Sequence, residues 1–281
     1  MMELLKAALF GLVEGVTEWL PVSSTGHMIL LNEFVRLDVS QDFWDMFLVV
    51  IQFGAILAVV LLYWKTIWPL GLYTHRKRTR VVWKREVLML WVKTIVACIP
   101  AAVVGVLFDD WLDEHLYNWL VVSVMLIVVG IAFIIVEVKN KDMVPVTTEL
   151  SDLSMKEALL IGMFQLIAAI LPGTSRSGAT IIGGLLIGVS RTVAAQFTFI
   201  LAIPVMAGAS LLKIVKYLHE GNSFSGTEVQ IMAVGLIVAF LVSVVIIRFL
   251  MNYIRRHDFK VFGWYRIAIG ALVILYFALL H

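Results

Sequence analysis

The stretch GLVEGVTEWLPVSSTGH, from Gly11 to His27, and the stretch GMFQLIAAILPGTSRSGAT, from Gly162 to Thr180, repeat one pattern 151 residues apart. An ungapped alignment pairs Gly11 with Gly162, Pro21 with Pro172, Glu14 with Gln165, Glu18 with Ala169, Ser24 with Ser175, Thr25 with Arg176 and His27 with Gly178. The carboxylates and the histidine occur in the first copy and the arginine in the second. This division is typical of one composite site shared by the two halves of a duplicated fold.

Composition predicts an integral membrane protein of helical type. Hydrophobic residues make up 61% of the chain, charged residues make up 15%, and the mean hydropathy is +0.97. The apolar runs are long and continuous, whereas the strands of a membrane β-barrel alternate in hydrophobicity over about ten residues. The basic run from Arg76 to Arg85 is typical of an orientation signal in contact with anionic lipid, so we expect no nucleic-acid partner.

Six apolar segments are long enough to cross a bilayer, which takes roughly 17 to 25 residues. They are 45–64, 87–108, 119–138, 196–218, 229–251 and 263–280. The segments that flank the two motifs are mostly too short to cross: 3–20 and 27–37 around the first, 157–171 and 179–190 around the second. Proline removes a backbone donor and disfavours helical geometry in the residue before it. Leu20-Pro21 and Leu171-Pro172 are therefore expected to end half-helices within the membrane, at the tips of re-entrant hairpins.

Charge in the loops predicts the orientation. The loop 65–85 contains five Lys or Arg residues between Arg76 and Lys84 and no acidic residue, which places it in the cytoplasm. Loops 139–156 and 252–262 then lie inside, whereas loops 38–44, 109–118 and 219–228, which contain no Lys or Arg, lie outside. This assignment is consistent only if each motif segment returns to the side from which it entered.

With this orientation, the first half of the chain begins on the outer side of the membrane and the second half begins on the cytoplasmic side. The sequence predicts an all-α polytopic membrane protein with a single domain over 1–281. Its two inverted repeats, about 1–138 and 152–281, each contain one re-entrant helical hairpin and three transmembrane helices. Such repeats place broken-helix ends around a ligand near the bilayer midplane. The hydroxyls and backbone N–H groups at the starts of the following half-helices favour anions, phosphate above all. The hydroxyls of the first tip come from Ser23, Ser24 and Thr25.

Three ionisable residues near the tips suit phosphate chemistry. Glu14 and Glu18 are four residues apart and share one helix face, so they could hold one hard divalent cation such as Mg²⁺. Arg176 donates from a planar fork that stays charged and suits phosphate. The alternatives are a structural role for the glutamates, bonded to nearby backbone, and a neutralising role for Arg176, paired with one of them. A buried ionisable group costs about 2.5 to 3.5 kcal/mol on the insertion scale, which argues against a purely structural role for all three.

Ser24 and His27 are the candidate nucleophile and base, because a hydroxyl is a weak nucleophile until a neighbouring group takes its proton. Ser24 could instead be only the N-cap of the following helix, and His27 a satisfied internal histidine. Gln52 is polar in the middle of a span, and we expect it to bond the broken backbone near a tip.

The runs EGVTEWLPVSSTGH (Glu14–His27) and LPGTSRSGAT (Leu171–Thr180) resemble the undecaprenyl-diphosphatase family, also called the bacitracin-resistance protein family. The resemblance extends over the whole chain. It implies functional roles for Glu14, Glu18, Ser24, His27, Ser175, Arg176 and Thr180. It also implies divalent-metal dependence, on Mg²⁺ or Ca²⁺, and a site that opens to the outer face of the bacterial plasma membrane.

Members of that family hydrolyse undecaprenyl diphosphate and so recycle the lipid carrier for peptidoglycan synthesis. They confer resistance to bacitracin, which competes for the same lipid. We therefore expect Arg176, the metal and the hydroxyls of Ser175, Ser177 and Thr180 to hold the pyrophosphate. Ser24 would attack with His27 managing its proton, and a metal-activated water is the competing version.

A transporter or flippase for a polyprenyl phosphate lipid is the alternative, because inverted repeats with broken helices are common in secondary transporters. The set of two glutamates, a serine and a histidine exceeds what anion binding requires and favours hydrolysis. The sequence is compatible with a homodimer and does not fix the oligomeric state.

Overall fold

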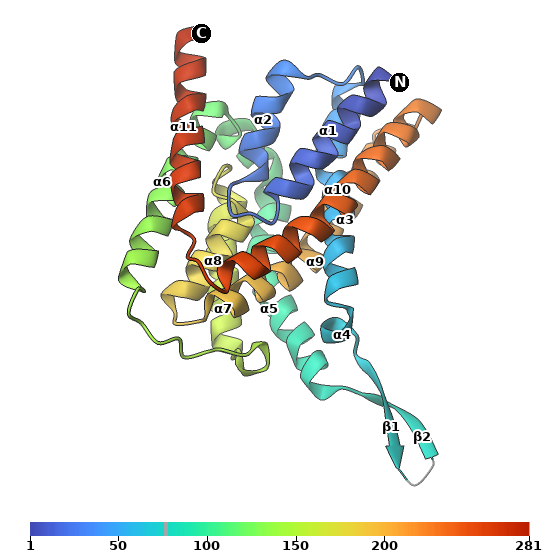
Figure 1. The fold of residues 1–281 in the computed structure, drawn as a ribbon. Helices are drawn as coiled ribbons and strands as arrows, with labels where there is room; N and C mark the ends of the chain where they lie inside the picture. Colours follow the sequence, from blue (N-terminus) through green and yellow to red (C-terminus); the bar gives the residue numbers. More distant parts are fainter. Residues whose placement is uncertain (76–77, 281) are drawn as a thin grey trace.

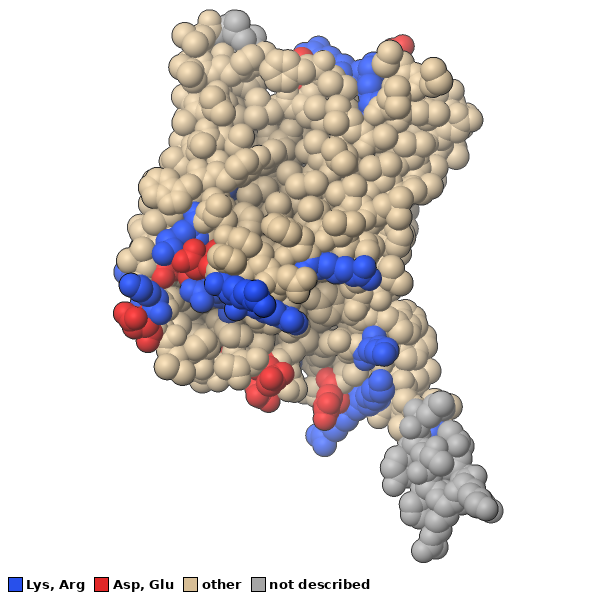
Figure 2. Space-filling view, in the orientation of Figure 1, with Lys and Arg blue, Asp and Glu red and all other residues tan. Residues whose placement is uncertain are grey.

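The computed structural model describes residues 1–75 and 78–280. Six long helices form most of the molecule (Figure 1) and are long and apolar enough to cross a membrane. They are α3 (Gln41–Leu62), α5 (Arg85–Leu116), α6 (Trp119–Lys139), α9 (Arg191–His219), α10 (Gly226–Ile254) and α11 (Lys260–Leu280). Each contains all or nearly all of one predicted span, so that prediction is confirmed. Figure 2 shows a broad uncharged band between charged side chains near the two ends of the molecule, as a lipid-facing surface requires.

The segments around the two motifs form two helical hairpins, as predicted. The first contains α1 (Met2–Thr17) and α2 (Ser24–Phe34), and the second contains α7 (Met155–Ile170) and α8 (Arg176–Leu186). With 16 residues or fewer, each of these helices is too short to cross a bilayer alone. The second break falls where proline chemistry places it, because α7 ends at Ile170 and Leu171 adopts extended geometry before Pro172. In the first hairpin α1 already ends at Thr17, three residues before Leu20, and a run of turns leads through Pro21.

Two predicted loops contain regular structure. The loop 65–85 includes α4 (Trp64–Ile67) and an antiparallel pair of strands, β1 (Leu70–His75) and β2 (Arg78–Trp83), in the register Leu70↔Trp83 to His75↔Arg78. The fold is therefore helical with one small hairpin, which projects from the end of the molecule opposite the two chain termini (Figure 1). Arg76 and Lys77 lie outside the described residues. The segment 109–116, expected to be loop, continues helix α5.

The glycines that align between the motifs have the same packing role. A Cβ at Gly11 would lie 2.5 Å from the carbonyl oxygen of Gly235 in α10, and one at Gly162 would lie 2.2 Å from that of Ala97 in α5. Neither position can hold a side chain without moving a helix. Each hairpin thus packs its first helix closely against a long helix from the other half of the chain.

The tips rest on a hydrophobic core formed by α3, α6, α8, α9, α10 and the start of α11. Trp19, in the first tip, is fully buried and meets Phe199 of α9 edge to face, with ring centroids 5.3 Å apart. This contact fixes the height of the first tip beside α9, the helix that also contacts the second tip.

Candidate active site

Both tips pass into their second helix through a serine with a positive φ angle. Ser23 has φ 72° and Ser175 has φ 70°, a region that residues other than glycine rarely adopt. Each hydroxyl accepts a hydrogen bond from the backbone N–H three residues on, at Gly26 and at Gly178. Such a conformation costs about 1 to 3 kcal/mol and is typical of functional sites. The N-cap of α2 is therefore Ser23, and Ser24 is the first residue of the helix.

This geometry corrects the ungapped alignment of the motifs. Ser23 corresponds to Ser175, because both have the same backbone conformation and the same capping bond. One extra residue lies between proline and serine in the second copy, so Ser24 corresponds to Arg176 and Gly26 to Gly178. The first residue of the second helix is therefore Ser24, with a hydroxyl, in the first tip and Arg176, with a guanidinium, in the second.

Glu18 joins the two tips. Its Oε1 accepts a hydrogen bond of 2.9 Å from Nη2 of Arg176, and its Oε2 accepts one of 2.9 Å from the hydroxyl of Ser24. The side chains of this ion pair are 7% and 13% exposed. An ion pair that is shielded from bulk water is screened little by salt. Removal of one partner is therefore costly, because it leaves the other charge buried and unpaired. The ion pair of Arg176 with a motif glutamate, which was the alternative to phosphate binding, is present, and the same glutamate also bonds a serine hydroxyl.

His27 does not bond to Ser24. Its Nδ1 lies 2.7 Å from the backbone oxygen of Ser23 and its Nε2 lies 2.8 Å from the hydroxyl of Tyr265 in α11. A carbonyl oxygen can only accept, so Nδ1 carries the proton and Nε2 accepts from Tyr265. The side chain that accepts the hydrogen bond of the Ser24 hydroxyl is that of Glu18.

Two of the predicted hydroxyls in the second tip support Arg176 and its helix. Ser177 donates to the backbone oxygen of Glu18 at 3.0 Å, which links the tips a second time. Thr180 donates to the backbone oxygen of Arg176 at 2.9 Å and accepts a bond of 2.8 Å from Thr198 in α9. The backbone oxygen of Thr198 in turn accepts from Nη1 of Arg176 at 3.0 Å. Thr198 was missed from the sequence, since nothing distinguishes it from other threonines in apolar spans.

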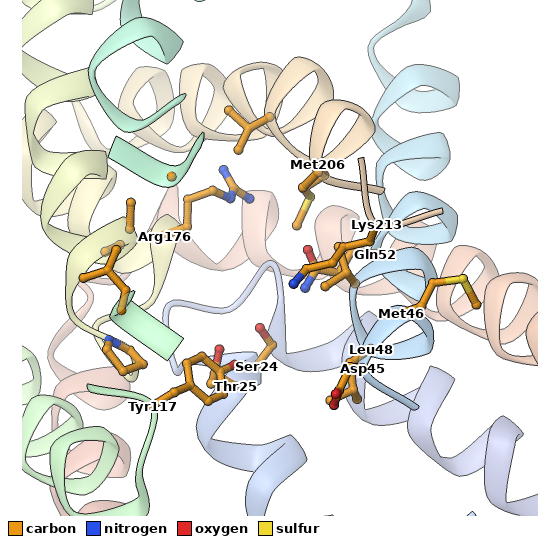
Figure 3. Close-up of a pocket in the computed structure, with 18 of the residues that line it drawn as sticks. Ser24, Thr25, Asp45, Met46, Leu48, Gln52, Tyr117, Arg176, Met206 and Lys213 are labelled. Carbon is orange, nitrogen blue, oxygen red and sulfur yellow. The ribbon is translucent and has the colours of Figure 1, made fainter. Parts of the chain in front are cut away.

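A cavity of about 700 Å³ opens beside the Glu18–Arg176 pair. Figure 3 shows Arg176 from α8 and Ser24 from α2 pointing into it. Five of the predicted site residues line this cavity: Glu18, Ser24, Thr25, Ser175 and Arg176. The other five are not among its lining residues: Glu14, Ser23, His27, Ser177 and Thr180. Gln52 lines the cavity, and it has no hydrogen bond to either tip in the described part of the chain, contrary to expectation.

Buried polar atoms without a hydrogen-bond partner gather at the two tips. Among the described residues they are Oε1 of Glu14, Nε1 of Trp19, both amide atoms of Gln165, Oγ1 of Thr174 and Nε of Arg176. Each such atom costs about 1 to 3 kcal/mol unless a ligand, ion or water satisfies it. Their concentration in residues 14–19 and 165–176 is typical of a binding site.

A divalent cation fits the carboxylates of the first tip. Glu14 is 1% exposed, its Oε1 has no partner, and it lies within electrostatic range of Glu18 and Arg176. The described residues contain no cluster of three or more His, Cys, Asp or Glu side chains suited to a metal. Mg²⁺ usually takes one or two carboxylates and leaves its other positions to water and substrate phosphates, so two are sufficient.

The chain is similar to known proteins over almost its whole length. The sequence model of the family described as "Bacitracin resistance protein BacA" matches residues 7–272. The undecaprenyl-diphosphatase of Desulfitobacterium hafniense is 57% identical over 99% of this chain and 97% of its own length. Those of Enterococcus faecalis, 55% identical over 96% of both chains, and Lactiplantibacillus plantarum, 52% identical over 100% of both, are similar as well. By both measures, the chain belongs to the bacitracin resistance protein family.

Proposed function

We propose that this protein hydrolyses undecaprenyl diphosphate to undecaprenyl phosphate and inorganic phosphate. The observation that carries the proposal is that Glu18 of the first tip bonds both Ser24 and Arg176 at a cavity wall. A nucleophile (Ser24), a proton acceptor (Glu18) and a positively charged group that binds phosphate (Arg176) thus lie next to one another. The relatives named undecaprenyl-diphosphatase support the same substrate.

The pyrophosphate binds at the cavity wall where both tips are exposed. The guanidinium of Arg176 binds a phosphate oxygen from the cavity wall, and Ser175 and Thr25 offer hydroxyls beside it. Ser177 and Thr180 act behind them by holding the backbone of Glu18 and Arg176. The prenyl chain lies along the apolar surface of the long helices, as lipid does.

Glu14 and Glu18 would hold a divalent cation, Mg²⁺ or Ca²⁺. When bound, the cation neutralises charge that develops on the phosphate oxygens. The unpartnered Oε1 of Glu14 supports this assignment, because a bound cation would satisfy a buried oxygen that no hydrogen bond in the described residues satisfies.

Ser24 is the proposed nucleophile. Its oxygen attacks the terminal phosphorus and its proton passes to Oε2 of Glu18, while the bond from phosphorus to the bridging oxygen breaks and that oxygen leaves on undecaprenyl phosphate. Water then cleaves the phosphoserine and releases inorganic phosphate. Positioning and charge stabilisation dominate phosphoryl transfer, which is what Arg176 at the tip provides. Direct attack by a water predicts instead that no phosphoserine forms.

The site opens to the outer face of the bacterial plasma membrane in this proposal. The cavity continues to the charged ends of α3 and α9, where it is lined by Asp42, Asp45, Lys216 and Glu220. These residues adjoin loops 38–44 and 219–228, which the charge pattern places outside. Released phosphate would leave on that side, the lipid carrier would be recycled, and consumption of the lipid that bacitracin binds would confer resistance.

The architecture behind the site is proposed to be two inverted repeats, about 1–138 and 152–281. The packing supports this, because the first helix of each hairpin packs on a long helix of the other half: α1 on α10, and α7 on α5. The matched serines with positive φ support it too.

The test is phosphate release from undecaprenyl diphosphate by the purified protein in detergent, with Mg²⁺, with Ca²⁺ and with EDTA. We expect release that depends on the metal and stops in Glu18→Ala. No release from well-folded wild-type protein with either metal would overturn the proposal. Mass spectrometry of protein quenched during a single turnover decides between phosphoserine at residue 24 and direct attack by water.

A further inference from the structure

A second arginine, Arg266 in α11, lies at the tips and was not identified from the sequence. It is 0% exposed, and all of its hydrogen bonds in the described structure go to backbone carbonyl oxygens. No carboxylate pairs with it in the described residues. A buried cation without a counter-ion is costly, and in a membrane span it is a functional hypothesis by default.

The guanidinium binds both tips at once. Nη1 donates to the backbone oxygen of Pro21 in the first tip at 3.1 Å. Nη2 donates to the backbone oxygens of Gly173 at 2.8 Å and Thr174 at 3.0 Å in the second tip. Longer contacts of 3.4 Å reach the oxygens of Met125 and Leu126 in α6. The planar fork of arginine can reach carbonyls on two segments, which the point charge of lysine cannot do equally well.

A close helix crossing brings Arg266 to this position. A Cβ on Gly130 of α6 would lie 2.7 Å from the oxygen of Gly263 in α11, and a Cβ on Gly263 would lie 2.7 Å from the oxygen of Gly130. Gly173 has φ +87°, and a Cβ there would lie 2.4 Å from the oxygen of Val122 in α6. The second tip and α11 thus each lie close to the backbone of α6, and from α11 the guanidinium of Arg266 reaches both tips.

One of these bonds orients the peptide group between Thr174 and Ser175. In a trans peptide the N–H points opposite its own carbonyl oxygen. With the oxygen of Thr174 held by Arg266, the N–H of Ser175 points the other way, and Ser175 lines the cavity. The same bonds fix the height of the second tip, and therefore of Arg176, against the first tip with Ser24.

We propose that Arg266 is a positioning residue, which holds both tips through their carbonyl oxygens and so sets the distance between Ser24 and Arg176 without contacting substrate. The kinetic part rests on the proposed hydrolysis, and the structural part does not.

The test compares Arg266→Met and Arg266→Lys with wild type and with Arg191→Met. Arg191 is a matched control, because it donates in a bidentate manner to the buried Glu137 and its bonds do not involve the tips. We expect folded Arg266→Met to lose about 10- to 100-fold in kcat with KM changed less than about threefold, because misplacement of reacting groups affects the transition state most. Arg266→Lys is expected to be intermediate, and Arg191→Met is expected to keep the wild-type kcat below its melting temperature.

Hydrogen exchange gives a readout independent of activity. Amides of residues 20–26 and 173–179 should exchange at least about tenfold faster in Arg266→Met, and in Arg266→Lys to a lesser degree, but not in Arg191→Met. Wild-type kcat and wild-type tip exchange in either folded Arg266 variant would overturn the proposal. If wild type proves inactive, the hydrolysis proposal fails and tip exchange still decides the role of Arg266. If Arg266→Met does not fold, the kcat and the tip exchange of Arg266→Lys test the proposal instead.

Discussion

The tip at residues 18–24 and the tip at residues 171–176 have the same backbone entry into their second helix and different chemistry beyond it. Both use a serine with positive φ that caps the helix. The next residue is Ser24 in one tip and Arg176 in the other, and the preceding helix carries Glu14 in one and Gln165 in the other. The repeated backbone supplies two equivalent positions, and the divergent side chains supply complementary groups. In our proposal, neither tip contains a complete site alone.

The largest expected effect comes from the first helical residue of the first tip. Ser24→Ala should lower kcat at least about 10³-fold if Ser24 forms the phosphoserine. The neighbouring Thr25→Val, which also alters the cavity wall, should lower kcat/KM about tenfold at most, the worth of one neutral hydrogen bond. Single-turnover phosphate release measures both. More than a tenth of the wild-type rate in Ser24→Ala would remove the nucleophile from our scheme.

The corresponding residue of the second tip is tested by Arg176→Lys, which keeps the charge. Lysine cannot bond Glu18 and the oxygen of Thr198 with the geometry of the fork, so kcat should fall about 10²- to 10³-fold. Steady-state phosphate release in detergent is the measurement. The control is Arg191→Lys at the buried Glu137, which should lower the melting temperature and leave kcat near wild type. Equal losses of kcat in both variants would mean that general stability accounts for the effect.

Substitutions at the aligned residues Glu14 and Gln165 test whether the carboxylate of the first hairpin binds the metal ion. Glu14→Gln should raise the Mg²⁺ concentration for half-maximal activity about 10- to 100-fold, the usual cost of weakening a metal site. Gln165→Glu should lower stability by burying an unpaired charge and leave the Mg²⁺ dependence unchanged. Titration of activity with Mg²⁺ is the readout. An unaltered titration curve in Glu14→Gln would place the cation elsewhere.

The smallest effect concerns the matched serines. At both Ser23 and Ser175, alanine loses the capping bond and keeps the strained φ, whereas glycine loses the bond and relieves the strain. Alanine should therefore cost about 1 kcal/mol more than glycine at each tip. Thermal unfolding in detergent gives the order of stability. Opposite orders at the two tips would show that Ser23 and Ser175 are not equivalent.

The fold was largely predictable because membrane helices are encoded locally. Length and hydrophobicity give the six spans, and Pro172 marks the end of α7. The end of α1 at Thr17 was not predictable, since the chain leaves the helix before its proline and the side chain in these turns, Trp19, is buried by residues from distant helices. The one-residue offset between the motifs required the φ angles of Ser23 and Ser175, because an ungapped alignment already matches both prolines.

The sequence could name candidate residues for the site, and their roles stay predictions, whereas the contacts between them could not be predicted. The sequence indicates Glu18, Ser24 and Arg176 as polar residues in apolar surroundings, and the fold then decides that Ser24 donates to Glu18 and that His27 bonds Tyr265. Arg266 carried an available signal, a lone charge inside the span 263–280. It lies 93 residues beyond the second tip at Gly173, so no motif pointed to it.

The most direct test of a site divided between the two tips is a double-mutant cycle on Glu18 and Arg176. Phosphate release is measured for wild type, Glu18→Gln, Arg176→Lys and the double variant under one set of conditions. If the two residues act as a unit, each single change lowers kcat about 10²- to 10³-fold and the double variant is no slower than the slower single variant. Losses that multiply in the double variant would mean that the tips act independently, and would contradict a composite site.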